Sequence, residues 1–243
     1  MTRHVTQMTI DDAAHFSDAQ RKAIIESYPD YEREARVKGV PVLGSGRVFP
    51  VAEESFVIDP VSIPAHWPQV NGLDFGWDHP FAAVNLAHDR DADCVYVTKE
   101  YAAREETPPV HASAVKAWGE WVPCAWPQDG LQHDKGSGKA LAEQYRAQGL
   151  NMLASSARFA EGGAGVEAGI SDMLTRMKTG RWKVFRTCGG WLGEFRLYHR
   201  KDGVIEKLRD DRISASRYAL MMLRYAAVKP VGGWTRADSK WVV

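Results

Sequence analysis

Hydrophobic residues come in short runs from position 70 onward, and the spacing of these runs changes along the chain. Three apolar runs follow one another closely, and the polar residues 89–93 separate the last two. Such short connections predict an antiparallel meander of three strands. Beyond residue 110, stretches with helical periodicity alternate with short apolar runs. The pattern therefore predicts a mixed α/β domain.

Periodicity and the positions of glycine and proline set the expected boundaries. A hairpin is expected to turn at Asp202-Gly203, because Asp-Gly is a strong two-residue turn signal. The expected strands lie at residues 73–75, 82–87, 94–101, 121–126, 150–153 and 182–185, and the expected helices at residues 110–119, 138–148, 166–177, 191–198 and 211–228.

The first 66 residues have a different composition. A helical stretch at residues 17–25 is followed by glycines and prolines clustered in residues 39–50. This density of turn formers is typical of a linker. We expect residues 1–66 to form an extended arm with one or two short helices and no core of its own. The main domain is expected to span residues 67–230, and a C-terminal tail residues 231–243.

Composition restricts the class of protein. A chain of 243 residues with 44% hydrophobic content can bury the core of one generous domain. Cys94, Cys124 and Cys188 are scattered, without zinc-site spacing or the density of a secreted disulfide scaffold. No apolar run is long enough to span a membrane, and no signal peptide opens the chain. We expect an intracellular protein without a membrane partner.

Charge is balanced overall but unevenly placed. The net charge is zero, yet residues 171–229 contain fourteen Lys or Arg against six acids. This local excess is either a surface that follows a phosphate backbone or the solvated faces of ordinary helices. The candidate DNA-binding residues in this region are Lys183, Arg200, Lys201, Lys207 and Arg212.

Carboxylates recur where apolar runs begin or end. Asp74 lies in an apolar run, and a buried carboxylate needs a cation or a basic group nearby. The alternative is that it caps the following turn. Asp129 follows a predicted strand and precedes Gly130, which is also ordinary turn chemistry. His133 and Asp134 in the next loop are less specific candidates for a metal site.

Asp210 and Asp211 stand where the last helix is expected to begin. One of them can serve as the N-cap, which leaves the other free. If Asp211 faces inward, Ser214 lies one turn later on the same side and can hydrogen-bond a ligand water. Together with Asp74 and Asp129, these acids predict an oxygen-ligand site for Mg²⁺ or Mn²⁺.

Two other metal or phosphate patterns are excluded. Residues 136–139 read Gly-Ser-Gly-Lys, but a Walker motif needs a glycine where this chain has His133 and a Ser or Thr where it has Ala140. The eight histidines show no H-E-x-x-H pair and no zinc-like spacing. We therefore expect no ATP-binding loop and no zinc site.

Several segments together resemble the C-terminal nuclease domain of tailed-bacteriophage terminase large subunits, in particular podovirus-type members. The segment at residues 39–50 is similar to the link between the motor ATPase domain and the nuclease. This resemblance implies a ribonuclease H-like fold, with a mixed central sheet flanked by helices and an extended N-terminal arm. The segments that carry it are residues 72–76, 126–130, 136–139, 166–170, 180–185, 198–203 and 210–219.

The resemblance also implies an activity and a site. It implies a metal-dependent endonuclease that cuts concatemeric double-stranded viral DNA, with Asp74, Asp129 and one of Asp210 or Asp211 as ligands. Some relatives place a histidine and a later aspartate in the last motif, where this chain has Asp211 and Ser214, so the third ligand stays open. The implied partners are the motor ATPase domain, the small terminase subunit and the portal, in the host cytoplasm.

The expected chemistry is phosphodiester hydrolysis with two Mg²⁺ or Mn²⁺ ions bridged by Asp74. Phosphate contacts carry little sequence information, so cleavage with weak sequence preference is expected. Two alternatives remain. One is a branched-DNA resolvase or integrase-like nuclease on the same fold. The other is a non-catalytic docking module for the packaging motor, in which the acids are caps and turns.

Overall fold

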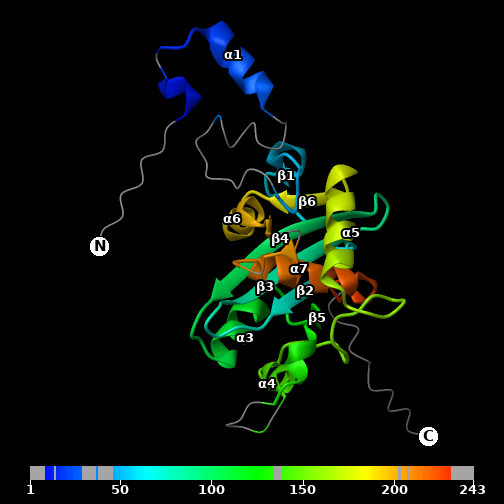
Figure 1. The fold of residues 1–243 in the computed structure, drawn as a ribbon. Helices are drawn as coiled ribbons and strands as arrows, with labels where there is room; N and C mark the ends of the chain where they lie inside the picture. Colours follow the sequence, from blue (N-terminus) through cyan, green and yellow to red (C-terminus); the bar gives the residue numbers. More distant parts are fainter. Residues whose placement is uncertain are drawn as a thin grey trace, which may run out of the picture.

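The computed structural model of the chain describes residues 9–13, 15–28, 37, 46–133, 138, 140–201, 204–206 and 208–230. Within these residues, six strands form one mixed sheet at the centre of the fold (Figure 1). The strands are β1 (Val57–Ile58), β2 (Gln69–Asp74), β3 (Phe81–Asp89), β4 (Cys94–Ala103), β5 (Cys124–Ala125) and β6 (Trp182–Phe185), in the spatial order β1-β6-β4-β3-β2-β5.

The middle of the sheet is the predicted meander. Strands β2, β3 and β4 pair antiparallel, with Asp74 opposite Ala82 and Asp89 opposite Cys94. The turn between β3 and β4 forms because Asp89 Oδ1 accepts hydrogen bonds from the amides of Asp91 and Ala92. The outer pairs, β2 with β5, β4 with β6, and β6 with β1, are parallel. This confirms the expected mixed sheet of the ribonuclease H-like class.

Helices cover both faces of the sheet (Figure 1). Helices α5, α6 and α7 pack against one face, and α3 and α4 against the other. A hairpin of β7 (Arg200–Lys201) and β8 (Val204–Ile205) forms where it was expected, although its turn at residues 202–203 lies outside the described residues. The helices are α1 (Asp18–Ser27), α3 (Pro108–Lys116), α4 (Leu141–Ala147), α5 (Val166–Lys178), α6 (Gly189–Leu197) and α7 (Asp211–Met221).

Alternation along the strands creates two hydrophobic clusters among the described residues. Val70 and Ala82 face the cluster beneath α5, α6 and α7, whereas Leu73 and Ala83 face the cluster beneath α3 and α4. Both faces of the central strands are therefore buried. Successive side chains of a strand point to opposite faces, and these strands have apolar residues on both. Apolar side chains therefore pack on both sides of the sheet along β2.

Three expected elements differ most from the structure. Of the expected strand at residues 121–126, only β5 forms, and it pairs with β2. Residues 150–153 form no strand and contribute an isolated bridge between Met152 and Cys124 of β5. The last helix was expected to reach residue 228 but ends at Met221. Beyond it a 3₁₀ turn leads to Ala227, whose backbone pairs with Gln69 in β2. Sheet pairing thus replaces the helical hydrogen bonds there.

Part of the expected arm packs on the domain. Helix α1 buries none of its residues. In contrast, Val48, Phe49 and Phe56 are buried in the core beneath α6, and β1 extends the sheet next to β6. We did not predict this strand. The domain limits at residues 66 and 230 stay predictions, and residues 38–45 and 231–243 lie outside the described part of the chain.

Cys94, Cys124 and Cys188 are all buried and unpaired. Among the described helices, none has the length and hydrophobicity needed to cross a bilayer.

Candidate active site

Asp74 and Asp129 come from neighbouring parallel strands. Asp74 is the last residue of β2, and Asp129 lies in the 3₁₀ turn Gln128–Leu131 that directly follows β5. Because β2 and β5 run parallel, their carboxyl ends meet at one edge of the sheet. The fold therefore brings together two acids that are separated by more than fifty positions in the sequence.

Helix α7 carries the other two acids to the same edge. Asp211 is its first residue and Asp210 precedes it. The helix lies directly on β2 because position 72 is glycine. A Cβ atom at Gly72 would overlap the carbonyl oxygen of Ala215 in α7. The close approach of helix and strand, which only glycine permits there, places α7 directly against β2, the strand that ends in Asp74.

All four predicted acids line a single pocket of about 470 Å³. The loop after β2, the residue after β4 and the first two turns of α7 also line this pocket. The remaining lining residues are Phe75, His79, Pro80, Arg104, Val166, Leu208, Arg209, Ser214, Arg217 and Tyr218.

The acids influence one another electrostatically. Burial raises the pKa of Asp74 well above its usual value, and the nearby charges of Asp129, Asp211 and Asp210 raise it further, while Arg217 lowers it. Burial also raises the pKa of Asp129. Within the described residues, no donor reaches the buried Oδ1 of Asp129. A buried carboxylate oxygen without a hydrogen-bond partner destabilises the fold, and a bound cation would satisfy it.

Asp211 is buried, with 6% of its surface exposed, and His79 Nδ1 lies 3.0 Å from its Oδ1. Ser214 lines the same pocket, as expected, and its hydroxyl donates to Asp210 Oδ2 at 3.4 Å, because position 214 lies one full turn after 210. His79 was not among the predicted site residues, and only its place in the loop after Asp74 pointed to it.

Neither Asp210 nor Asp211 caps the helix with its side chain. The cap comes from α6: Glu194 Oε2 accepts hydrogen bonds from the amides of Arg212 at 2.7 Å and Ile213 at 3.1 Å. Asp210 stands at the N-cap position, as expected, but its side chain makes no capping hydrogen bond to the helix amides. Because a distant carboxylate satisfies the helix amides, neither aspartate is needed as a side-chain cap, and both line the pocket.

A divalent cation fits this site by donor chemistry. The carboxylates are hard oxygen donors of the kind that Mg²⁺ and Mn²⁺ prefer. As the side chains stand, no three His, Cys, Asp or Glu residues in the described part of the chain are close enough to hold an ion together. The acids line one pocket without closing a ligand cage, so cation binding requires side-chain adjustment of Asp74, Asp129 and one of Asp210 or Asp211.

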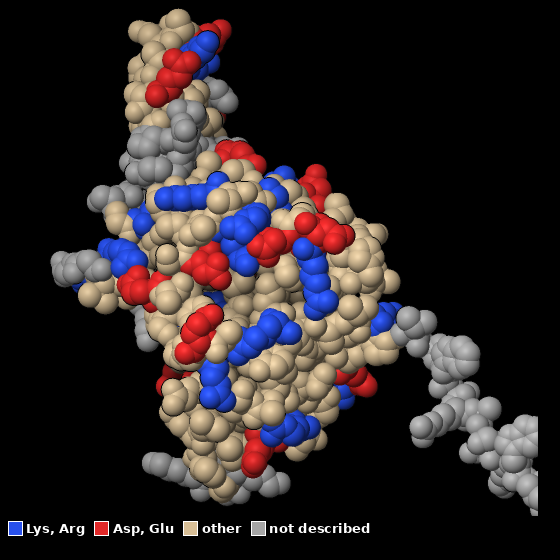
Figure 2. Space-filling model, turned by 90° about the vertical axis from the view of Figure 1, so that its right-hand side faces the viewer, with Lys and Arg blue, Asp and Glu red and all other residues tan. Residues whose placement is uncertain are grey.

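The predicted DNA-binding residues lie elsewhere or are engaged. Arg200 forms a bidentate pair with Glu167, and Lys183 donates to the backbone carbonyl of Ser55. Lys201 is exposed on β7, and Lys207 lies outside the described residues, as do Asp134 and most of the glycine-rich segment 136–139. On the face shown in Figure 2, basic and acidic side chains are interspersed.

Arg212 is engaged as well. It pairs with Glu194 at 2.8 Å and with Glu100 at 3.0 Å, so it links β4, α6 and α7. The cations that line the acidic pocket are instead Arg104, Arg209 and Arg217, which we did not predict. The position of Arg209 directly before Asp210 was the one signal in the sequence that could have identified it.

Two family models match the chain. Residues 71–223 match the terminase RNaseH-like domain, and residues 1–56 match a model described as the terminase large subunit, T4likevirus-type, N-terminal. The chain is 46% identical over 226 residues to the terminase large subunit of Salmonella phage P22, covering 93% of this chain and 45% of that protein. It spans about half the length of the curated relatives that it matches.

Solved structures agree with these matches. The P22 large terminase nuclease domain superposes with a TM-score of 0.72 at 44% identity, covering 76% of this chain and 96% of that one. The nuclease domain of the bacteriophage SPP1 large terminase, solved with bound Mn, has a TM-score of 0.52 at 18% identity, covering 70% and 97%. At this lower identity the likeness shows the fold alone.

Proposed function

The chain belongs to the terminase RNaseH-like domain family, and from this premise we propose that it is the DNA-cleaving part of a phage packaging terminase. Its substrate is concatemeric double-stranded DNA, which it hydrolyses at phosphodiester bonds with weak sequence preference. The observation that carries the proposal is the single pocket lined by Asp74, Asp129, Asp210 and Asp211 at one edge of the sheet.

Asp74, Asp129 and one of Asp210 or Asp211 would hold two Mg²⁺ or Mn²⁺ ions. When bound, such ions activate water and stabilise the leaving oxygen of a phosphodiester. The Mn in the SPP1 nuclease structure supports a divalent cation in this fold. The raised pKa of Asp74 supports it too, because a carboxylate crowded by other acids is stabilised by added positive charge.

The chain's own residues prepare the site. His79 orients the Asp211 carboxylate through its Nδ1 contact. Arg217, buried beside the acids, favours the ionised form of Asp74. The Glu194 cap holds the start of α7 so that Asp211 faces the pocket. These groups position the acids before DNA arrives, which reduces the cost of ordering them during the reaction.

Cleavage of plasmid DNA in the presence of Mn²⁺ tests the proposal. Asp74→Asn and Asp129→Asn should abolish cleavage, whereas Asp91→Asn, in the exposed turn after β3, should leave it unchanged. Undiminished cleavage by the Asp74 variant would refute the assignment. Comparison of Asp210→Asn with Asp211→Asn identifies the third ligand, which should be the more damaging change.

The same assay separates the alternatives. A resolvase-like enzyme would cleave a four-way junction faster than a linear duplex, whereas a packaging nuclease should cleave the duplex at least as well. A non-catalytic docking module would bind no Mn²⁺ in calorimetry.

We also propose that the chain works with a motor ATPase domain, a small terminase subunit and the portal. The match of residues 1–56 to an N-terminal large-subunit model supports the motor domain as a partner.

A further inference from the structure

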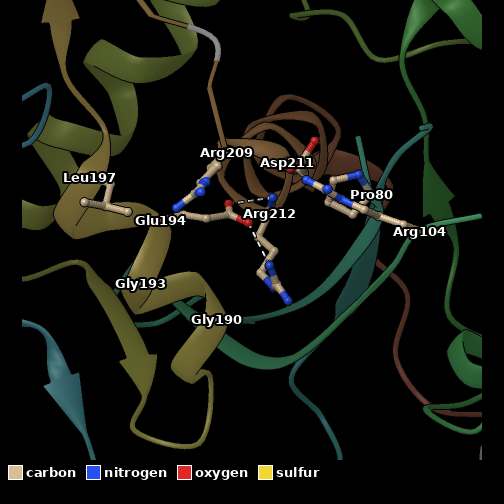
Figure 3. A pocket seen from close by; sticks show the side chains of 9 residues that line it. All are labelled: Pro80, Arg104, Gly190, Gly193, Glu194, Leu197, Arg209, Asp211 and Arg212. Carbon is tan, nitrogen blue, oxygen red and sulfur yellow. Dashed lines mark hydrogen bonds and ion pairs between the residues drawn. The ribbon is translucent and has the colours of Figure 1, made fainter. Parts of the chain in front are cut away.

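A second pocket of about 260 Å³ adjoins the acidic one (Figure 3). Asp211, Pro80, Arg104 and Arg209 line both pockets, so these residues lie at the boundary that the two share. The second pocket is otherwise lined by Gly190, Gly193, Glu194, Leu197 and Arg212.

The two pockets differ in the charge that they offer. Two acids line the second pocket. Asp211 is contacted by His79, and Glu194 is already satisfied by Arg212 and by the amides at the start of α7. The amides of Gly190 and Trp191 at the start of α6 are likewise taken by Glu100. The helix ends are thus not available to an anion, and the positive charge of the second pocket must come from side chains.

Arg104 and Arg209 supply that charge. Within the described residues, neither forms a hydrogen bond or an ion pair, although Arg212 beside them is held by two glutamates. In Figure 3 the two side chains lie on either side of the Glu194–Arg212 ion pair. They come from segments about a hundred residues apart, one after β4 and one before α7, and the fold brings them to a single opening.

The backbone is strained next to both arginines. Arg209 itself has a φ of 58°, and Glu105, directly after Arg104, has a φ of 55°. Non-glycine residues in this left-handed region are uncommon, and such strain concentrates where a ligand is bound. Arg209 lies where the chain enters α7. Its backbone conformation there fixes the direction in which the Arg209 side chain points.

We propose that Arg104 and Arg209 together bind one phosphate of the DNA strand, next to the phosphate that faces Asp74 and Asp129. The guanidinium groups match the geometry of phosphate oxygens and hold them with paired hydrogen bonds. This inference rests on the proposed function, because it places the strand across the acidic pocket. The two arginines are positioning residues that fix the register of the strand.

Duplex binding at a series of salt concentrations tests the inference. Fluorescence anisotropy of a labelled linear duplex in EDTA measures binding without cleavage. Loss of one phosphate contact in the Arg104→Ala/Arg209→Ala double variant should reduce the slope of log K against log salt by about 0.9. Arg90→Ala is the matched control, because Arg90 is exposed at the opposite end of β3 from the acids. Its slope should equal that of the unaltered chain.

A second measurement separates phosphate binding from an effect on the acids. Mn²⁺ affinity by calorimetry should be the same in the double variant and the unaltered chain. In cleavage assays the lysine substitutions Arg104→Lys and Arg209→Lys should keep the salt slope but raise KM, since lysine lacks the paired donors. An unchanged slope in the double variant, or no measurable duplex binding by the unaltered chain at low salt, overturns the inference.

These outcomes are independent of the proposed cleavage. Asp74→Asn should lose cleavage and keep the full salt slope. If that variant still cleaves DNA, the assignment of the catalytic acids is wrong. The salt slopes of the arginine variants still test the phosphate site, because they are measured without cleavage. If cleavage is lost as expected but the arginine variants bind as the unaltered chain does, only the phosphate site fails.

Discussion

His79 Nδ1 lies 3.0 Å from Asp211 Oδ1, so the loop after β2 is joined to the first turn of α7 across the pocket. The side chain of His79 is 63% exposed, whereas that of Asp211 is 9% exposed. The histidine therefore covers the acid from the solvent side. It also lowers the pKa of Asp129 through its charge, so it contacts or influences two of the four acids.

We expect His79→Ala to reduce Mn²⁺-dependent cleavage by about 10–100-fold, the usual cost of losing a partner that orients a metal ligand. His79→Asn retains a donor near the position of Nδ1 and should lose less. His66→Ala, at an exposed histidine outside the pocket, is the control. Equal losses in the Ala and Asn variants would show that orientation of Asp211 is not the role of His79.

Gly72→Ala should push α7 away from β2. The added Cβ would overlap the carbonyl oxygen of Ala215, which is backbone and cannot rotate aside. We expect a loss of about 1–3 kcal/mol in the free energy of unfolding, together with weaker Mn²⁺ binding. Gly189→Ala, where a Cβ meets open space, is the matched control. Normal Mn²⁺ affinity in the Gly72 variant would show that helix spacing does not set the site.

Glu194→Gln tests the cap on α7. Burial raises the pKa of Glu194 to about 7, while the Arg212 ion pair opposes this rise. The glutamine can still accept from the helix amides but leaves Arg212 with Glu100 alone. Breaking one side of a buried pair should cost about 3 kcal/mol of stability. Glu143→Gln on the exposed face of α4 is the control. Chemical denaturation of both variants measures the difference.

Asp74→Asn should stabilise the protein in the absence of metal. Folding raises the pKa of Asp74, so its contribution to stability is full below the usual aspartate value near 3.9 and is lost as the pH rises through the raised pKa. Asparagine does not ionise, so the variant does not lose this contribution to stability as the pH rises. At neutral pH in EDTA we expect a gain on the order of 1 kcal/mol, since one pKa unit corresponds to about 1.4 kcal/mol.

Denaturant unfolding at an acidic and at a neutral pH provides the measurement. The Asn variant and the unaltered chain should agree at the acidic pH and separate at the neutral one. Asp91→Asn, in the exposed turn after β3, should follow the unaltered chain at both. A variant that is less stable at neutral pH would mean that the ionised Asp74 is satisfied without a cation.

The four acids that line the pocket could be selected as candidates from the sequence because each stands where an apolar run meets a polar one. Asp74 ends β2 and Asp211 begins α7, and both positions follow from local periodicity. Strand β6 was likewise predicted with its observed limits at residues 182–185, since its apolar residues are bounded by turn formers. Local patterns therefore located the ends of elements, where the candidate site lies.

The partners of these residues could not be predicted in the same way. Glu194 caps a helix on another element, and Arg104 reaches the pocket from a loop that is remote in sequence from Arg209. A count of charge along the chain also cannot separate Arg200, which pairs with Glu167, from an arginine without a partner. Such assignments depend on the register of the sheet and on helix packing, which are tertiary properties.

Arg217 provides the last test, because it is a buried cation next to buried acids. Only 3% of its surface is exposed, its side chain packs where Gly169 leaves room in α5, and its guanidinium lies 4.4 Å from the ring centre of Tyr218. Its charge lowers the pKa of Asp74. Removal of that charge should raise the pKa further, so protons compete with Mn²⁺ up to a higher pH.

We therefore expect Arg217→Met, which retains most of the packing volume, to move the pH at which Mn²⁺ is half-bound upward by about one unit. Arg217→Lys retains the charge and should move it less. Calorimetric titration with Mn²⁺ at a series of pH values measures both shifts. If the Met and Lys variants shift equally, the shift comes from altered packing against Gly169, and the positive charge does not control ionisation of Asp74.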